Sequence, residues 1–300
     1  LMHLRIPVGI DQVIHYLVEE SLIAVQDNGL YAITTMGALL FAKNFREFNN
    51  LSRKRVRLVM YKDTTKRVIL KEPEFESGYA AGFEELYELV TAMVEGEEVF
   101  EKGIRMRTTA IPPSTIRELI ANALIHQDLL QTGVGPIIEI FTNRIEVTNP
   151  GRSLVDVSRI VDNPPRSRNE KMASLMRRLG LCEELGSGWD RIILDSEAYR
   201  LPAPKIIEYE ESVRVIAYAA TSFSNLSLDD KIRACYLHAT ILLMSDGYLT
   251  NTSLRNRFGL PASASPVVSR LIKEALKRNL IKPLDPSTAP RYMKYIPFWA

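Results

Sequence analysis

The chain has 300 residues, of which 46% are hydrophobic and 25% are charged. This composition is typical of folded globular domains and excludes disordered, collagenous and disulfide-rich chains. The two cysteines, Cys182 and Cys235, have no Cys or His neighbour at metal-ligand spacing, which predicts reduced thiols and a cytoplasmic protein. No apolar run approaches the roughly 20 residues that cross a bilayer, so we expect no membrane partner.

Charge divides the chain into two unequal parts. Residues 226–300 contain 11 Lys and Arg against 5 Asp and Glu, a net charge of +6, and residues 1–225 contain 27 against 31, a net charge of −4. At about 150 residues per domain, the length also predicts more than one unit. We expect a flanking α/β part over residues 1–110, a core over 111–225 and a small basic module over 226–300.

Hydrophobic periodicity predicts helices and short strands before residue 100. The helices are expected over residues 11–20, 34–41 and 80–94, and the strands over residues 30–33, 56–61 and 67–70. Thr34 or Thr35 is expected to cap the second helix. The apolar stripe of the third helix is assigned to the core.

The middle of the chain carries sharper signals. Helices are expected over residues 114–126, 167–180 and 186–199, and hairpins over residues 137–148 and 205–218. The run Pro112-Pro113-Ser114 predicts a helix start with Ser114 as the N-cap. Helices interleaved with mostly antiparallel strands predict an α+β fold, a two-layer α/β sandwich.

The helix over residues 114–126 presents a polar face that could carry chemistry. Glu118, Asn122 and His126 stand at positions i, i+4 and i+8 and so share one face. A carboxylate can act as a base toward water, and a carboxamide oxygen is a ligand that Mg²⁺ accepts. The same spacing also fits a solvated polar face, so the residue pattern leaves both interpretations open.

A short glycine-containing segment begins the helix over residues 186–199. Gly186-Ser187-Gly188 leaves unpaired backbone N–H groups at a helix N-terminus, which favours an anion. The alternative is a plain helix-entry turn, since a lone GxG string has little specificity.

Taken in order, these segments resemble the GHKL ATPase superfamily, in its divergent branch of bacterial transcriptional regulators of the RecG-like C-terminal type. Residues 117–128 resemble the N-box, residues 145–151 the strand that ends in Asn149-Pro150-Gly151, and residues 179–192 the second glycine box, with Ser167-Arg168-Asn169 between them. The resemblance implies a sandwich of the Bergerat type. It also implies an upstream Schlafen/AlbA-type domain, so we expect the chain to be part of a longer protein.

The resemblance assigns roles to individual residues. Glu118 would be the catalytic base, and Asn122 would bind Mg²⁺ through the nucleotide. His126 would lie beside the ATP cofactor or orient the helix. Asn149 and Gly151 would contact adenine, with Asn149 standing where catalytically competent relatives carry aspartate. Contact with phosphate would come from Gly186, Ser187 and Gly188.

The basic module has the order of a winged helix-turn-helix domain. Helices are expected over residues 229–244, 250–258 and 265–279, the last with Ser265 as N-cap, followed by strands over 280–284 and 291–296. In this class the third helix enters the major groove of double-stranded DNA. The residues expected to contact DNA are Ser269, Arg270, Lys273, Lys277, Lys282, Arg291 and Lys294. The alternative is a winged helix that binds protein.

Two functional hypotheses follow. The first is an ATP-binding and DNA-binding bacterial transcriptional regulator, with slow Mg²⁺-dependent ATP hydrolysis left open. The alternative is a non-hydrolysing core that senses a ligand or forms a homodimer. The sequence has no GxxxxGK[ST] string, so helicase activity is not expected of this chain.

Overall fold

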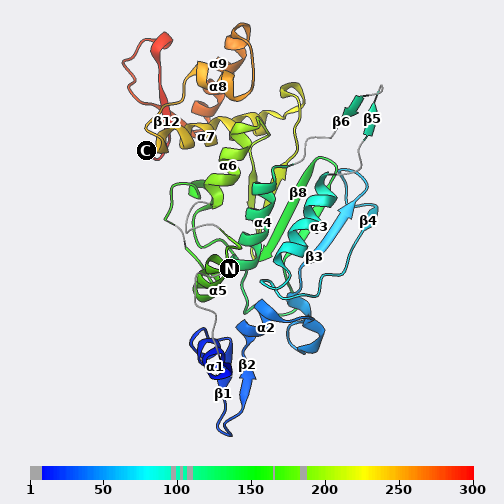
Figure 1. Ribbon diagram of the computed structural model, residues 1–300. Coiled ribbons are helices and arrows are strands. Elements are labelled where there is room, and N and C mark those ends of the chain that lie inside the picture. The colour runs from blue at the N-terminus through cyan, green and yellow to red at the C-terminus, as the bar shows by residue number, and fades with distance from the viewer. Residues whose placement is uncertain (1–8, 96–98, 102–103, 107–110, 165, 183–187) are drawn as a thin grey trace.

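The computed structural model describes residues 9–95, 99–101, 104–106, 111–164, 166–182 and 188–300. Its centre is a six-stranded mixed sheet with helices packed against one face, and a separate group of helices follows toward the C-terminus (Figure 1). This arrangement is compatible with the predicted α+β class. None of the described helices combines the length and the hydropathy needed to span a bilayer.

The sheet has the strand order β4-β3-β7-β8-β10-β9. Its strands are β3 (Arg57–Tyr61), β4 (Ile69–Lys71), β7 (Ile137–Phe141), β8 (Arg144–Pro150), β9 (Lys205–Glu208) and β10 (Ser212–Tyr218). β3 and β7 run parallel, and the other neighbouring pairs are antiparallel. The two predicted hairpins, β7–β8 and β9–β10, are therefore confirmed.

The helices around the sheet begin and end close to the predicted positions. They are α1 (Ile10–Glu19), α2 (Thr35–Phe41), α3 (Phe83–Glu95), α4 (Pro113–His126), α5 (Glu170–Arg178) and α6 (Gly188–Ala198). Two small hairpins lie outside the sheet, formed by β1 (Ile23–Val25) with β2 (Tyr31–Ile33) and by β5 (Val99–Glu101) with β6 (Ile104–Met106). Thr34 caps α2, as predicted, by accepting a hydrogen bond from the backbone N of Gly37 at 2.9 Å.

The predicted N-cap of α4 is wrong. The helix begins at Pro113, whose missing N–H costs nothing in the first turn. Ser114 therefore lies inside the helix, and its hydroxyl donates a hydrogen bond to Asp195 of α6. The neighbouring Thr115 hydroxyl donates to the same carboxylate at 2.8 Å. These two bonds join the start of α4 to α6.

Alternation along the strands decides which face of the sheet carries the core. Ile138 and Ile140 of β7 and Ile145 and Val147 of β8 pack with the apolar side of α4 and are at most 2% exposed. The intervening residues point to the opposite face and include the buried carboxylates of Glu139 and Glu146. Tyr61 donates a hydrogen bond to Glu139 at 3.0 Å, and Arg144 donates to Glu146 at 2.7 Å. Both carboxylates are thus paired, as burial of a charge requires.

The C-terminal module has its own hydrophobic core. It contains α7 (Leu228–Met244), α8 (Asn251–Arg257), α9 (Ser265–Lys277), and the antiparallel strands β11 (Ile281–Pro283) and β12 (Tyr295–Pro297). Val268, Ile272 and Ala275 of α9 are buried against α7 and α8. This is the predicted order of elements, but Ser265 is the first residue of α9, and Ala264 is its N-cap. β12 begins at Tyr295 because residues 290–292 form a 3-10 turn.

Candidate functional site

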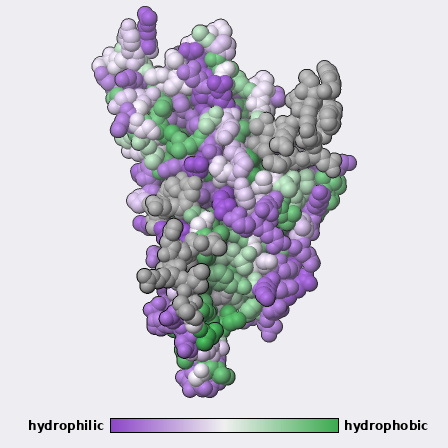
Figure 2. All heavy atoms as spheres, in the orientation of Figure 1, coloured by the Kyte–Doolittle hydropathy of each residue, from purple (hydrophilic) through white to green (hydrophobic). Residues whose placement is uncertain are grey.

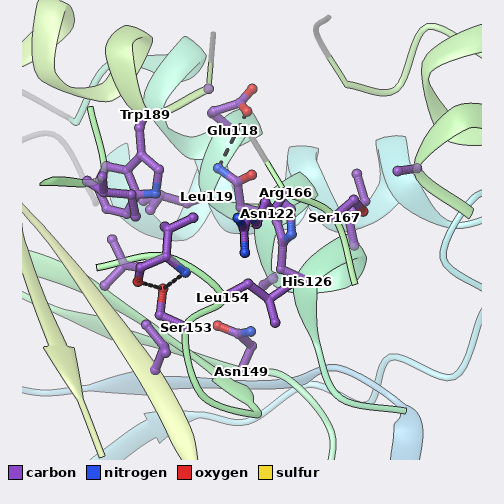
Figure 3. A pocket seen from close by; sticks show the side chains of 18 of the residues that line it. Glu118, Leu119, Asn122, His126, Asn149, Ser153, Leu154, Arg166, Ser167 and Trp189 are labelled. Carbon is purple, nitrogen blue, oxygen red and sulfur yellow. Dashed lines mark hydrogen bonds between the residues drawn. The ribbon is translucent and has the colours of Figure 1, made fainter. Parts of the chain in front are cut away.

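The polar face of α4 lines a cavity between the helices and the sheet. Glu118, Asn122 and His126 all lie along its wall, and Asn149 and Ser153 lie across from them (Figure 3). Glu118 is only 7% exposed, and its Oε1 accepts a hydrogen bond of 3.4 Å from Asn122 Nδ2. A fully solvated polar face is therefore excluded for Glu118.

Most of the cavity wall is apolar. The sheet contributes side chains from β8 and β10, and α6 and residues between 152 and 164, with 166 and 167, form the other walls. The apolar lining includes Leu119, Val147, Trp189, Ile192, Val213 and Val215. A cavity with a few polar groups among apolar side chains is the usual form of a small-molecule site.

The first residue of α6 lies directly against the Glu118 carboxylate. A Cβ added to Gly188 would come within 1.9 Å of Glu118 Oε1, so any other residue at this position requires the Glu118 side chain to move. Gly188 also lines the cavity, as predicted for a phosphate-contacting residue. The other two residues of that prediction, Gly186 and Ser187, lie outside the described residues. The start of α6 is thus held beside the carboxylate that could activate water.

The two residues predicted to contact adenine occupy different environments. Asn149 lines the cavity from the end of β8, opposite Val213 in the sheet register, and its side chain makes no hydrogen bond with the described residues. Gly151 is buried with φ +100°, and a Cβ there would meet Asp128 Cβ at 2.8 Å. Gly151 is therefore required by the turn after β8, whereas Asn149 presents its carboxamide to the cavity.

Arginines dominate the charge of the cavity, which the sequence motifs did not reveal. Arg152, Arg166 and Arg177 line it, and Glu118 is the one acidic residue among the described lining residues. Arg152 lies 3.7 Å from Glu208. Arg166 and Arg177 form no ion pair within the described part of the chain, and Arg177 Nε donates only to Ala173 O at 3.4 Å, within its own helix. The excess of positive charge favours an anionic ligand.

Two titratable groups of the cavity are held neutral. Burial lowers the pKa of His126, and the nearby Arg168 guanidinium lowers it further, so His126 is uncharged at neutral pH. Burial raises the pKa of the Cys182 thiol to about 11, and Glu118 adds to this effect. Neither side chain can therefore neutralise an anion, and that role is left to the arginines.

The side chain of Asn169 binds the end of α4. Asn169 is the residue before α5, but its side chain does not cap that helix. Instead its Nδ2 donates to the carbonyl oxygens of Ile125 at 2.8 Å and Gln127 at 2.9 Å. These bonds satisfy carbonyls that the end of α4 leaves unpaired and fix the position of His126.

Most of the residues predicted to contact DNA are exposed cations of the C-terminal module. Six of the predicted DNA-contacting residues are solvent-exposed and form no ion pair with the described residues, namely Arg270, Lys273, Lys277, Lys282, Arg291 and Lys294. Ser269 differs, because it is half-buried and its hydroxyl accepts a hydrogen bond of 3.0 Å from Asn251. Figure 2 shows hydrophilic side chains over this module, at the top of the view.

Comparison with known protein families finds a match over part of the cavity region. Residues 133–217 match the ATPase-like family described as "Putative ATP-dependent DNA helicase recG C-terminal". The match includes Asn149 and the segment that leads to α6, but it ends short of α4 on the N-terminal side. No curated protein matches the chain.

Among solved structures, the following has a similar fold. It is the DIP2311 protein from Corynebacterium diphtheriae, with a TM-score of 0.54 and 20% sequence identity. The similarity covers 91% of this chain and 55% of that one, so this chain spans about half the length of the DIP2311 chain.

The close approach of Gly188 to Glu118 leads to a first prediction. Gly188→Ala should lower the free energy of unfolding by about 1–3 kcal/mol, because the new methyl group displaces the buried Glu118 carboxylate from its hydrogen bond with Asn122. In the background Glu118→Ala the same substitution should cost less than about 1 kcal/mol, because the clashing atoms are gone. Urea denaturation of the four proteins measures the difference. Equal losses in both backgrounds would show that the two residues do not touch.

Proposed function

We propose that the cavity beside α4 binds a nucleoside triphosphate, ATP, together with Mg²⁺. The observation that carries the proposal is the combination, in one cavity, of an apolar wall, a buried Glu118–Asn122 pair and arginines without an ion pair among the described residues. The apolar wall suits a base, and the arginines suit phosphates. The match of residues 133–217 to an ATPase-like family supports the same assignment.

The residues present fit such a ligand. The Asn149 carboxamide can donate to and accept from the edge of a base. Asn122 Oδ1 is an oxygen donor of the kind Mg²⁺ accepts, and a bound Mg²⁺ would neutralise phosphate charge. Arg177 and Arg166 can donate charge-assisted hydrogen bonds to phosphate oxygens.

Arg177 is the cation we expect to matter most, because it is half-buried and has no carboxylate partner in the described part of the chain. Arg177→Gln should weaken Mg-ATP binding about ten-fold or more, since a hydrogen bond to a charged group contributes roughly 1.5–3 kcal/mol. Adenosine binding should stay unchanged. Titration calorimetry with ATP, ADP and adenosine in Mg²⁺ buffer measures the preference for phosphate.

The neighbouring arginine supplies a matched control. Arg178 points away from the cavity and pairs with Glu20, so Arg178→Gln should leave the preference for ATP over adenosine at its wild-type value. If the Arg177 and Arg178 variants prefer ATP over adenosine equally, Arg177 does not contact the phosphates. If the wild-type protein takes up no ATP at millimolar concentration, the nucleotide proposal is wrong.

Hydrolysis would depend on Glu118 acting as a base toward water. Glu118→Gln keeps the shape of the side chain and loses the proton acceptor, so ATP affinity should persist while hydrolysis falls at least about 100-fold. Phosphate release under single-turnover conditions is the measurement. If the wild-type protein binds ATP without releasing phosphate, the core is a non-hydrolysing sensor, and unchanged turnover in the variant would exclude Glu118 as the base.

A second candidate function concerns the C-terminal module, which we propose binds double-stranded DNA as a winged helix. The supporting observation is the set of six exposed cations on α9 and the segments that follow it, none of them in an ion pair within the described residues. Such cations can neutralise phosphates along a duplex. A nucleotide-binding core joined to this module would make the chain a nucleotide-responsive transcriptional regulator of the bacterial cytoplasm.

Replacing the exposed cations of α9 tests this function. The triple variant Arg270→Ala, Lys273→Ala, Lys277→Ala should bind duplex DNA more weakly, and its dependence on the logarithm of salt concentration should fall by roughly 0.9 for each phosphate that the module no longer neutralises. Fluorescence anisotropy over a salt series gives both values. Arg278→Ala is the control, because Arg278 is already paired with Asp229 and Glu274. A triple variant that matches this control would indicate a protein-binding module instead.

A further inference from the structure

Helix α6 connects the cavity with the C-terminal module. It packs against both α4 and α7, and Figure 1 shows it running from beside α4 toward α7. Its first turns supply Gly188, Trp189 and Ile192 to the cavity wall. Its last turn carries Glu197, which faces the module. A helix of 11 residues is a stiff rod about 16 Å long, so a movement at one end is transmitted to the other.

Glu197 binds two residues of the C-terminal module in a buried network. One carboxylate oxygen pairs with Arg257 of α8, whose side chain is 1% exposed, and the other lies 2.6 Å from His238 Nδ1 of α7. Arg257 Nη2 also donates to the carbonyl of Leu201, just after α6, at 2.7 Å. Because a buried charge that loses its partner is strongly destabilising, this network fixes the end of α6 to the module.

The same module also holds a second wall of the cavity. Residues 153–155, 160 and 163–164 line the cavity. Between them, the carbonyl of Ser158 accepts a hydrogen bond of 2.6 Å from Tyr236 of α7. Trp299 donates to the same tyrosine oxygen at 3.1 Å, and its ring lies 5.0 Å from the Arg159 guanidinium. Both walls of the cavity are therefore bound to the C-terminal module.

We infer that the C-terminal module is a working part of the cavity, with Tyr236 and Arg257 as positioning residues that set the spacing between the 153–164 wall and α6. The effect on ligand affinity described next rests on the proposed nucleotide function. A ligand that draws the two walls together would change the position of the C-terminal module. By linkage, a partner that binds the module in that position would raise the affinity of the cavity for its ligand by the same factor by which the ligand raises the affinity for the partner. The module would thus sense occupancy of the cavity directly.

Two variants release one wall each. Tyr236→Phe removes only the hydroxyl that bonds Ser158, and Glu197→Gln weakens the hold on α6. Without nucleotide, amide hydrogen exchange should become faster over residues 153–164 in the first variant and over residues 188–196 in the second. Mg-ATP affinity should fall about five-fold in each, the lower end of usual coupling factors. Unfolding curves measured alongside separate this effect from a general loss of stability.

Controls of the same chemistry lie in the same module. Tyr292→Phe changes an exposed tyrosine, and Glu274→Gln changes a partner of the surface residue Arg278, so both should keep wild-type exchange and affinity. The inference would be overturned if amide hydrogen exchange of the two walls in Tyr236→Phe and Glu197→Gln equalled that of these controls. This holds whether or not nucleotide is present. If the wild-type protein binds no ATP, the proposed function fails, and the exchange data still decide whether the module holds the walls.

Discussion

The arrangement depends on one close approach, that of the Glu118 carboxylate to Gly188 at the start of α6. The apolar side of α4 packs on the sheet, which fixes the direction of its polar side. A Cβ at position 188 would displace the Glu118 carboxylate, so the absence of a Cβ lets α6 begin beside α4 with that carboxylate in place. From this approach follow the closeness of Trp189 and Ile192 to the cavity and the reach of α6 to the C-terminal module.

Side-chain hydrogen bonds fix both ends of α4. Ser114 and Thr115 bind Asp195, which joins the start of α4 to the later turns of α6. Asn169 binds the carbonyls at the end of α4 and so sets α5, with Arg177, beside the same cavity. The site is therefore built on packed helices, with side chains whose positions are fixed by second partners, as precise binding requires. The cavity wall over residues 152–164 takes its support from Tyr236.

Much of the fold could be predicted from the sequence because its signals are local. Alternation along residues 137–148 and the 3.6-residue period of α4 and α9 each depend on near neighbours. The grouping of Glu118, Asn122 and His126 followed from helical spacing. The predicted N-caps Ser114 and Ser265 were wrong. A proline indicates that a helix begins nearby, but it does not determine which residue is the first.

Interactions between distant segments could not be predicted in this way. Arg177 has the sequence pattern of a surface arginine, and only the packing of α5 brings it to the cavity. The network of Glu197 with Arg257 joins positions 60 residues apart, and no local pattern signals it. Asn169 directly precedes α5, but its side chain binds the carbonyls of α4, which no local pattern indicates.

The most direct test of the nucleotide site is a crystal structure of the protein grown with Mg²⁺ and a non-hydrolysable ATP analogue. Our account predicts electron density for the triphosphate beside Arg177, the metal ion beside Asn122, and the base against Asn149 and the apolar wall. Density for the analogue elsewhere on the protein, or a cavity that stays empty at millimolar analogue, would contradict the account.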